Sequence, residues 1–264
     1  MILKRHNESH KGSNGIVLVV GGSKTFTGAP IFAGLGALRA GADLAIIAAP
    51  RRAADTATAY SPDLITIPLE GDFLKMDHVK RIEDYIDKSD VLIIGPGLGK
   101  DKDTEKAIIE IIRLFKKLVV IDADALKAVS KNLDVLKEKN TILTPHRGEF
   151  EKLSGHVSSE EAVHSFAQEH KCVVLLKAHT DIISNGHEIK LNKTGNPGMT
   201  VGGTGDVLAG VTAGIAAQGI EPPNAAFSAA KIVGMAGDLA FVEKGYALLA
   251  SDVLEKVPEV LKKH

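Results

Sequence analysis

Short, continuously apolar runs alternate with longer helical patterns along this chain, and this alternation restricts the possible fold more than any other feature. A strand with one face in water alternates apolar and polar residues, whereas a strand covered on both faces is apolar throughout. The runs here are of the second kind and are rich in valine and isoleucine. They predict an α/β fold with a mainly parallel sheet, whose strands are residues 16–21, 43–48, 64–67, 91–94, 118–121, 141–143 and 173–176.

The segments between these runs have helical spacing, and the pattern changes only near the end of the chain. Residues 181–184 and 188–193 flank Asn185-Gly186, a dipeptide typical of a two-residue hairpin. The remainder from residue 204 is mostly helical, with patterns that open at Pro222 and Ser251. No linker or repeat divides the chain, so we expect one domain over residues 1–264. The other predicted helices are 30–39, 74–87, 104–115, 125–129 and 159–169.

The composition argues against nucleic acid and membranes as partners. The net charge is −1 over 264 residues, and Lys and Arg are dispersed rather than clustered. No apolar run approaches the ~20 residues of a membrane span, and the N-terminus lacks the apolar segment of a signal peptide. The single cysteine, Cys172, permits no internal disulfide and adjoins an apolar run, as expected of a small buried residue. We therefore expect a cytoplasmic protein.

Several polar and glycine-rich segments come directly after predicted strands. Residues 21–23, 95–99 and 144–146 and Asp122 each follow a different strand. In open parallel sheets the carboxyl ends of the strands form the ligand crevice. The sequence therefore predicts that these distant segments meet at one site.

The stretch GNPGMTVGGTGDVLAG, residues 195–210, predicts the chemistry of that site. Gly202, Gly203, Thr204 and Gly205 directly precede an apolar helical pattern. Unpaired amides and the macrodipole make such a helix start suitable for phosphate oxygens. A carboxylate would repel phosphate, so Asp206 is better explained as a base that takes a proton from an attacking hydroxyl. The alternative is a glycine-rich turn in which Asp206 caps the helix.

This stretch resembles the GxGD signature of ribokinase-like small-molecule kinases, and over its full length it resembles the ADP/ATP-dependent NAD(P)H-hydrate dehydratases. The resemblance extends over nearly the whole chain. It implies a ribokinase-like three-layer α/β/α sandwich. Five further segments match in the family's order: HKGSNGIVLVVGGSKTFTGAP (10–30), GPGLG (95–99), DADAL (122–126), LTPHRGEF (143–150) and LLKAHTDII (175–183).

The resemblance implies a repair reaction on hydrated NADH or NADPH. Phosphate from ADP or ATP would pass to the hydroxyl of the hydrated nicotinamide ring, and phosphate elimination would restore the double bond. Asp206 would activate the hydroxyl. The family places the main chain around Ala29, the glycines Gly97 and Gly99, and His146 against the hydrate. Without the family, a strand-to-helix turn is the alternative for the glycine segment.

On the nucleotide side the resemblance implies phosphate donors and a magnesium ligand. Glu149 matches the glutamate with which kinase relatives act on Mg²⁺, mostly through water, although it also suits a helix start. His146 stands where those kinases carry asparagine and favours the dehydratase branch. Asp122 and Asp124 could form a metal pair, but the DADAL segment also suits capping of helix 125–129, so neither is counted as a metal ligand and their roles stay open. The nucleotide contacts implied are Lys177, Ala178, His179, Thr180, Asp181, Asn196, Gly202, Gly203, Thr204 and Gly205.

Two alternative functions remain open at this point. One is a small-molecule kinase of the hydroxyethylthiazole or hydroxymethylpyrimidine type, which would release its phosphorylated product; His146 and the GNPGMT string argue against it. The other is a non-catalytic nucleotide sensor, which the presence of Asp206, Glu149 and Lys177 disfavours. The expected partners are the small-molecule substrates and further copies of the chain, in a homo-oligomer with a tetramer among the possible forms.

Overall fold

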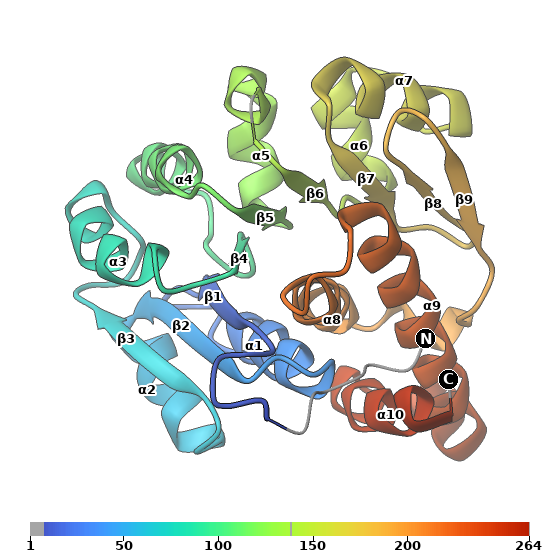
Figure 1. Ribbon diagram of the computed structural model, residues 1–264, viewed down its shortest axis with the longest axis horizontal. Helices are drawn as coiled ribbons and strands as arrows, with labels where there is room; N and C mark the ends of the chain where they lie inside the picture. Colours follow the sequence, from blue (N-terminus) through green and yellow to red (C-terminus); the bar gives the residue numbers. More distant parts are fainter. Residues whose placement is uncertain (1–7, 138, 264) are drawn as a thin grey trace.

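A single mixed sheet organises the protein, in a computed structural model that describes residues 8–137 and 139–263. The predicted domain, 1–264, thus extends beyond the described residues at both ends. Within them nine strands pair in the order β3-β2-β1-β4-β5-β6-β7-β8-β9 (Figure 1). Strands β1 to β7 run parallel, and the hairpin β8–β9 is antiparallel. The strands are β1 Ile16–Val20, β2 Leu44–Pro50, β3 Ile65–Leu69, β4 Val91–Ile94, β5 Leu118–Ile121, β6 Thr141–Leu143, β7 Val173–Leu176, β8 Asp181–Ser184 and β9 Ile189–Asn192.

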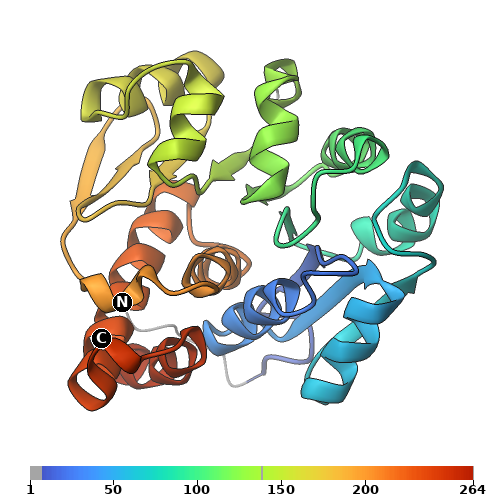
Figure 2. The same cartoon turned by 180° about the vertical axis from the view of Figure 1, so that it is seen from behind.

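Helices cover both faces of this sheet, which gives the predicted three-layer arrangement (Figures 1 and 2). One layer contains α1, α2, α8, α9 and α10, and the opposite layer contains α3 to α7. The helices are α1 Ala29–Arg39, α2 Arg51–Tyr60, α3 Val79–Ile86, α4 Lys102–Leu114, α5 Asp124–Ser130, α6 Arg147–Ser154, α7 Glu160–His170, α8 Thr204–Ala216, α9 Pro222–Lys244 and α10 Ala250–Lys263.

The continuously apolar strands are explained by this double cover. In β1, Val17 and Val19 belong to the core beneath α1 and α8, while Leu18 and Val20 belong to the core beneath α3 to α5. All four side chains are fully buried. Successive side chains of a strand point to opposite faces, so a strand between two helix layers can be apolar at every position.

Helix α9 is apolar because it belongs to the core. By length and composition residues 222–247 would be able to cross a membrane, but 56% of that apolar window is buried inside the fold. The helix contacts β6 to β9 and α8, and its buried alanines belong to the core. Core helices of water-soluble proteins pass the same test of length and composition, so this helix is no evidence for a membrane span.

Most predicted elements are confirmed, with ends that differ by a few residues, but the helices α2 and α6 were not predicted. The hairpin across Asn185-Gly186 forms as expected. Helix α2 was missed because its sequence RRAADTATAY is largely polar and buries only Ala53, Ala54 and Ala57. Small buried alanines give a weak apolar pattern, so a helix of this kind has little signal in a hydrophobicity scan.

Candidate active site

The polar segments after β4, β5, β6 and β7 meet beside the N-terminus of α8. Their closeness is plain at Gly95, which follows β4 and has φ +128°. A Cβ placed on it would lie 1.8 Å from the carbonyl oxygen of Asp122, after β5. Only glycine permits both this backbone angle and this approach. Farther along the same loop, a Cβ on Gly97 would meet the Cβ of Ala29 at 3.1 Å, so these two predicted hydrate contacts are neighbours.

Asp122 forms the centre of a buried ionic network. It is 1% exposed. Its Oδ1 accepts hydrogen bonds from Nζ of Lys177 at 2.9 Å and from Oγ1 of Thr144 at 2.8 Å. Of the possibilities open for Asp122, capping of α5 is excluded, because its carboxylate joins three strand ends and Ala123 is the N-cap. The next residue, Ala123, occupies the N-cap of α5 with φ +49°, a conformation that non-glycine residues rarely adopt.

Asp124 also does not cap α5 with its side chain, since it is the first residue of that helix. Its Oδ2 accepts a hydrogen bond of 2.8 Å from the backbone amide of Gly99, so it holds the end of the 95–99 loop. No described residue donates to its Oδ1. Burial is the main cause that raises the pKa of Asp124 above its ordinary value. This carboxylate thus lies on the side predicted to face the hydrate.

The N-terminus of α8 has the features of an anion site. Gly203 is the N-cap with φ +102° and provides no side chain to cap the amides. The hydroxyl of Thr204 is turned inward, toward the carbonyls of Met199 and Val201. Asp206 lies in the first turn rather than at the cap, so the capping alternative for it is wrong. A Cβ on Gly205 would lie 3.3 Å from Nζ of Lys177, which places that ammonium against the start of the helix.

The charges around Asp206 prepare it to act as a base near neutral pH. Burial, followed by the nearby negative charge of Asp122, raises its pKa to about 7. Lys177 opposes this shift, while Asp124 and Glu149 add to it. No described residue donates a hydrogen bond to the Asp206 carboxylate, so it can accept one from a substrate hydroxyl. A base with a pKa close to the working pH is the most effective in general-base catalysis.

Lys177 remains a cation in this setting. Burial alone would lower its pKa, but the charges of Asp122 and Glu149 and the hydrogen bond from Nζ to Asp122 raise it. Its backbone extends β7 by one isolated bridge to His146. An ammonium ion has three donors. Asp122 takes one of them, which leaves two for phosphate oxygens.

His146 and Glu149 form a capping box at the start of α6. The amide of Glu149 donates to Nδ1 of His146 at 3.2 Å, and the amide of His146 donates to Oε2 of Glu149 at 2.8 Å. The helix start suggested for Glu149 is therefore real. It leaves Oε1 directed toward Nε2 of His146, 3.5 Å away. Across residues 8–137 and 139–263, no three His, Cys, Asp or Glu side chains gather closely enough to enclose a metal.

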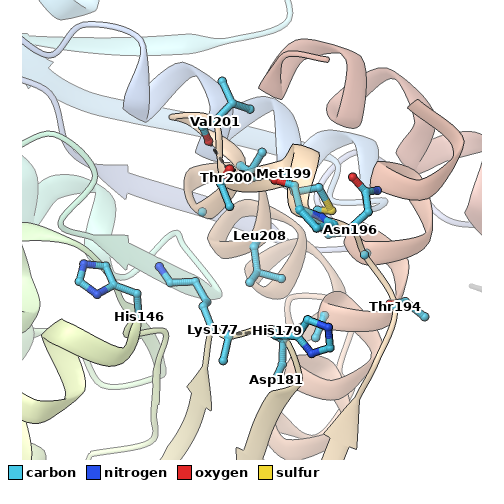
Figure 3. Close-up of a pocket in the computed structure, with 18 residues that line it drawn as sticks. His146, Lys177, His179, Asp181, Thr194, Asn196, Met199, Thr200, Val201 and Leu208 are labelled. Carbon is cyan, nitrogen blue, oxygen red and sulfur yellow. Dashed lines mark hydrogen bonds between the residues drawn. The ribbon is translucent and has the colours of Figure 1, made fainter. Parts of the chain in front are cut away.

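A cavity of about 610 Å³ opens beside these groups, between the strand ends and the helices α8 and α9. Figure 3 shows His146 and Lys177 at one end of it, and Thr194 and Asn196 at the other. Eight predicted site residues line it: His146, Lys177, Ala178, His179, Asp181, Asn196, Thr204 and Gly205. Among the predicted residues outside its lining, Ala29 and Gly97 neighbour each other and Gly99 is bonded to Asp124, as described above. Thr180, Gly202 and Gly203 adjoin lining residues in the chain.

Known proteins match this architecture and its sequence. The family described as NAD(P)H-hydrate dehydratase matches residues 17–259. The chain belongs to this family. It is 43% identical over 268 residues to a bifunctional NAD(P)H-hydrate repair enzyme of Pyrobaculum aerophilum, covering 98% of this chain and 53% of that protein. An ADP-dependent (S)-NAD(P)H-hydrate dehydratase of Cenarchaeum symbiosum is 40% identical over 265 residues, covering 98% and 92%.

Solved structures agree with the family and confirm the ribokinase-like fold. An ADP/ATP-dependent NAD(P)H-hydrate dehydratase of Bacillus subtilis, co-crystallized with ATP/Mg²⁺, superposes with a TM-score of 0.85 at 27% identity and covers 99% of this chain and 94% of that one. A ribokinase-like superfamily protein of Enterococcus faecalis gives 0.88 at 25% identity, covering 99% and 92%. The chain spans about half the length of the bifunctional relatives that it matches.

The structure of this family member adds residues that sequence reasoning did not single out. The apolar wall of the cavity comes from Met199, Leu208 and Val233, which α8, α9 and the preceding turn supply. Leu208 and Val233 belong to ordinary apolar helical patterns, so nothing in the sequence separates them from core residues. Asp181, by contrast, was among the predicted nucleotide contacts. Its carboxylate accepts hydrogen bonds from the amide of Ala178 and from Asn192, and so shapes the turn at the cavity edge.

Proposed function

We propose that this protein restores hydrated NADH or NADPH to the intact cofactor, with ADP or ATP as the phosphate donor. The observation that carries the proposal is the placement of Asp206. A carboxylate whose pKa is raised to about 7 lies in the first turn of α8, beside the Lys177 ammonium and the open amides of that helix. A base next to a phosphate site is what transfer of a phosphoryl group to a hydroxyl requires.

The cavity suits the adenosine half of the nucleotide. Its apolar wall can pack against a base, and its polar end contains Lys177 and the start of α8. A nucleotide seated there would extend its phosphates toward Lys177 and the amides of Thr204 and Gly205. Helix N-termini and lysine ammonium groups both stabilise phosphate charge. The names of the relatives from Cenarchaeum symbiosum and Nitrosopumilus maritimus favour ADP, and the Bacillus subtilis structure was obtained with ATP/Mg²⁺.

Glu149 is the residue that we propose for magnesium. Its Oε2 accepts the His146 amide, and its Oε1, which lies 3.5 Å from Nε2 of His146, is the carboxylate oxygen that we propose for the ion. That arrangement fits a Mg²⁺ ion held mainly by nucleotide oxygens and water, as this ion prefers. When bound, the ion would neutralise charge on the phosphates.

The reaction follows from the chemistry of the leaving group. Asp206 takes the proton of the hydrate hydroxyl as the hydroxyl oxygen attacks the terminal phosphorus of the nucleotide. The bond between that phosphorus and the rest of the nucleotide breaks. Lys177 and the α8 amides stabilise the charge on the transferred group. Hydroxide is a poor leaving group and phosphate a good one. The ring nitrogen's lone pair can therefore expel phosphate, and the double bond re-forms.

The test supplies the purified protein with NADH hydrate, Mg²⁺ and either ADP or ATP. We expect the near-ultraviolet absorbance of reduced nicotinamide to return, with one AMP formed from ADP for each NADH. A vitamin-precursor kinase would instead consume nucleotide only with its own substrate, and a sensor would bind nucleotide without consuming it. Loss of nucleotide dependence, or accumulation of a stable phosphorylated hydrate in the wild type, would contradict the proposal.

A cytoplasmic location is part of the same proposal. It is supported by Cys172, which is 3% exposed and whose burial raises the pKa of its thiol to about 12. A thiol in that state is an inert core residue rather than a redox group. The homo-oligomer expected from the sequence stays a prediction.

A further inference from the structure

The elimination step needs a second base, because the hydrate must lose a proton from carbon as well as a hydroxyl. Water added to an enamine double bond places the hydroxyl on C6, next to the ring nitrogen, and a hydrogen on C5. Restoring the bond removes both. The first base, Asp206, already holds the hydroxyl proton after phosphoryl transfer. A different group must therefore accept the C5 proton.

We propose that Asp124 is this base. Its Oδ2 is held by the Gly99 amide, at the loop that faces the predicted hydrate site together with Ala29 and Gly97. Its Oδ1 accepts no hydrogen bond from the described residues. Asp124 is partly exposed, and it is close enough to Asp206 for their charges to interact. This inference rests on the proposed function and adds a residue to that site.

Two other ionisable groups of the site, Asp122 and His146, are already engaged. The Oδ1 atom of Asp122 accepts from both Lys177 and Thr144, and its side chain is buried. In His146, Nδ1 accepts the Glu149 amide, so the neutral ring has its proton on Nε2 and no lone pair remains for a substrate proton. Among these groups, Asp124 has the free acceptor atom on the side of the 95–99 loop.

The step balances without any further reactant. The C6–O bond to phosphate breaks, phosphate leaves with the electron pair, and the nitrogen lone pair forms the N1=C6 bond of an iminium ion. Asp124 Oδ1 then takes the C5 proton. The electrons of the C5–H bond form C5=C6, and those of N1=C6 return to nitrogen. Burial raises the pKa of Asp124, which makes it a stronger proton acceptor than an exposed aspartate, and the proton later passes to water.

The substitution Asp124→Asn separates this role from a structural one, because the amide oxygen can still accept the Gly99 N–H. With enzyme in excess over NADH hydrate, AMP from ADP and NADH from the hydrate are followed over one turnover. We expect AMP to form at a rate within about threefold of the wild type, while NADH formation slows about 10²–10⁴-fold. Asp124→Glu should recover part of this loss. Asp101→Asn, the same change at the N-cap of the neighbouring helix α4, is the control and should keep one NADH per AMP.

A deuterium label gives a second measurement. The substrate is hydrate that carries deuterium on one defined face of C5, since a positioned base removes the hydrogen from one face only. We expect wild-type NADH to have a single isotopic composition and the residual Asp124→Asn product to be mixed. The inference is overturned if Asp124→Asn forms NADH normally, if AMP and NADH fall in the same proportion, or if its product stays isotopically uniform. Wild-type protein that consumes ADP without restoring NADH would instead refute the proposed function.

Discussion

Replacing Asp206 with asparagine should stop turnover and at the same time stabilise the substrate-free protein at neutral and alkaline pH. The amide has nearly the same shape as the carboxylate but cannot accept the hydroxyl proton, and loss of a general base lowers the rate about 10²–10⁴-fold. The expected gain in stability has a separate origin. The fold holds Asp206 where its charged form is disfavoured by burial and by Asp122. Asparagine has no charge to disfavour.

The magnitude follows from the pKa. The shift from the ordinary value of 3.8 to about 7 favours the protonated form in the folded state. Its stabilising effect is complete below the unfolded pKa of 3.8 and is lost as pH rises through about 7. At about 1.4 kcal/mol per unit, the upper limit is roughly 4 kcal/mol. The value of about 7 already includes the opposing effect of Lys177, and Asp206 is partly exposed, so we expect about 1–3 kcal/mol.

Thermal unfolding of both proteins between pH 4 and pH 8.5 measures this difference. Their free energies of unfolding should nearly coincide near pH 4, separate in favour of Asp206→Asn up to about pH 7, and stay parallel above it. Asp77→Asn, at an exposed position in the short 3-10 helix Met76–His78, should follow the wild-type curve. A variant that is less stable than wild type at pH 8, or one that keeps wild-type kcat, would refute the reasoning for Asp206.

Two further substitutions test the loops that frame the site. His146→Asn keeps a side-chain acceptor for the Glu149 amide, so stability should hold while KM for the hydrate rises several-fold and KM for the nucleotide stays the same, in steady-state kinetics. A rise in KM for the nucleotide alone would show that His146 contacts the nucleotide rather than the hydrate. Gly95→Ala should lower the free energy of unfolding by well over about 2 kcal/mol, because its Cβ overlaps the Asp122 carbonyl. Gly71→Ala, at φ +90° in open space, should cost only about 1 kcal/mol in the same denaturant titration.

The sequence was sufficient to predict the layers of the fold and the convergence of distant polar segments. The apolar runs predicted a sheet covered on both faces, and segments after different strands predicted the convergence that brings Gly95, Asp122 and Lys177 together. These predictions succeed because strand ends in a parallel sheet meet at one edge, whatever the details of the packing.

The roles of the aspartates could not be predicted in the same way. Asp122 and Lys177 are 55 residues apart in the sequence, and their 2.9 Å contact depends on the pairing of β5, β6 and β7. The DADAL segment looks locally like a helix start, so local reasoning leaves helix capping and metal binding as alternatives for its acids. Only the three-dimensional arrangement shows that Ala123 is the N-cap and that the acids on either side of it face different partners.

The balance of charge in the site gives a physical reason for its dependence on a cation. Three carboxylates, Asp122, Asp206 and Glu149, lie around the ammonium of Lys177, and together they raise its pKa. The site is therefore negative before a nucleotide with several further negative charges arrives. The amides of α8 and the two free donors of Lys177 offset part of that repulsion. A divalent ion beside Glu149 would offset more of it, so we expect nucleotide affinity to fall steeply when Mg²⁺ is removed, whereas the same negative charge keeps Asp206 basic enough for its reaction.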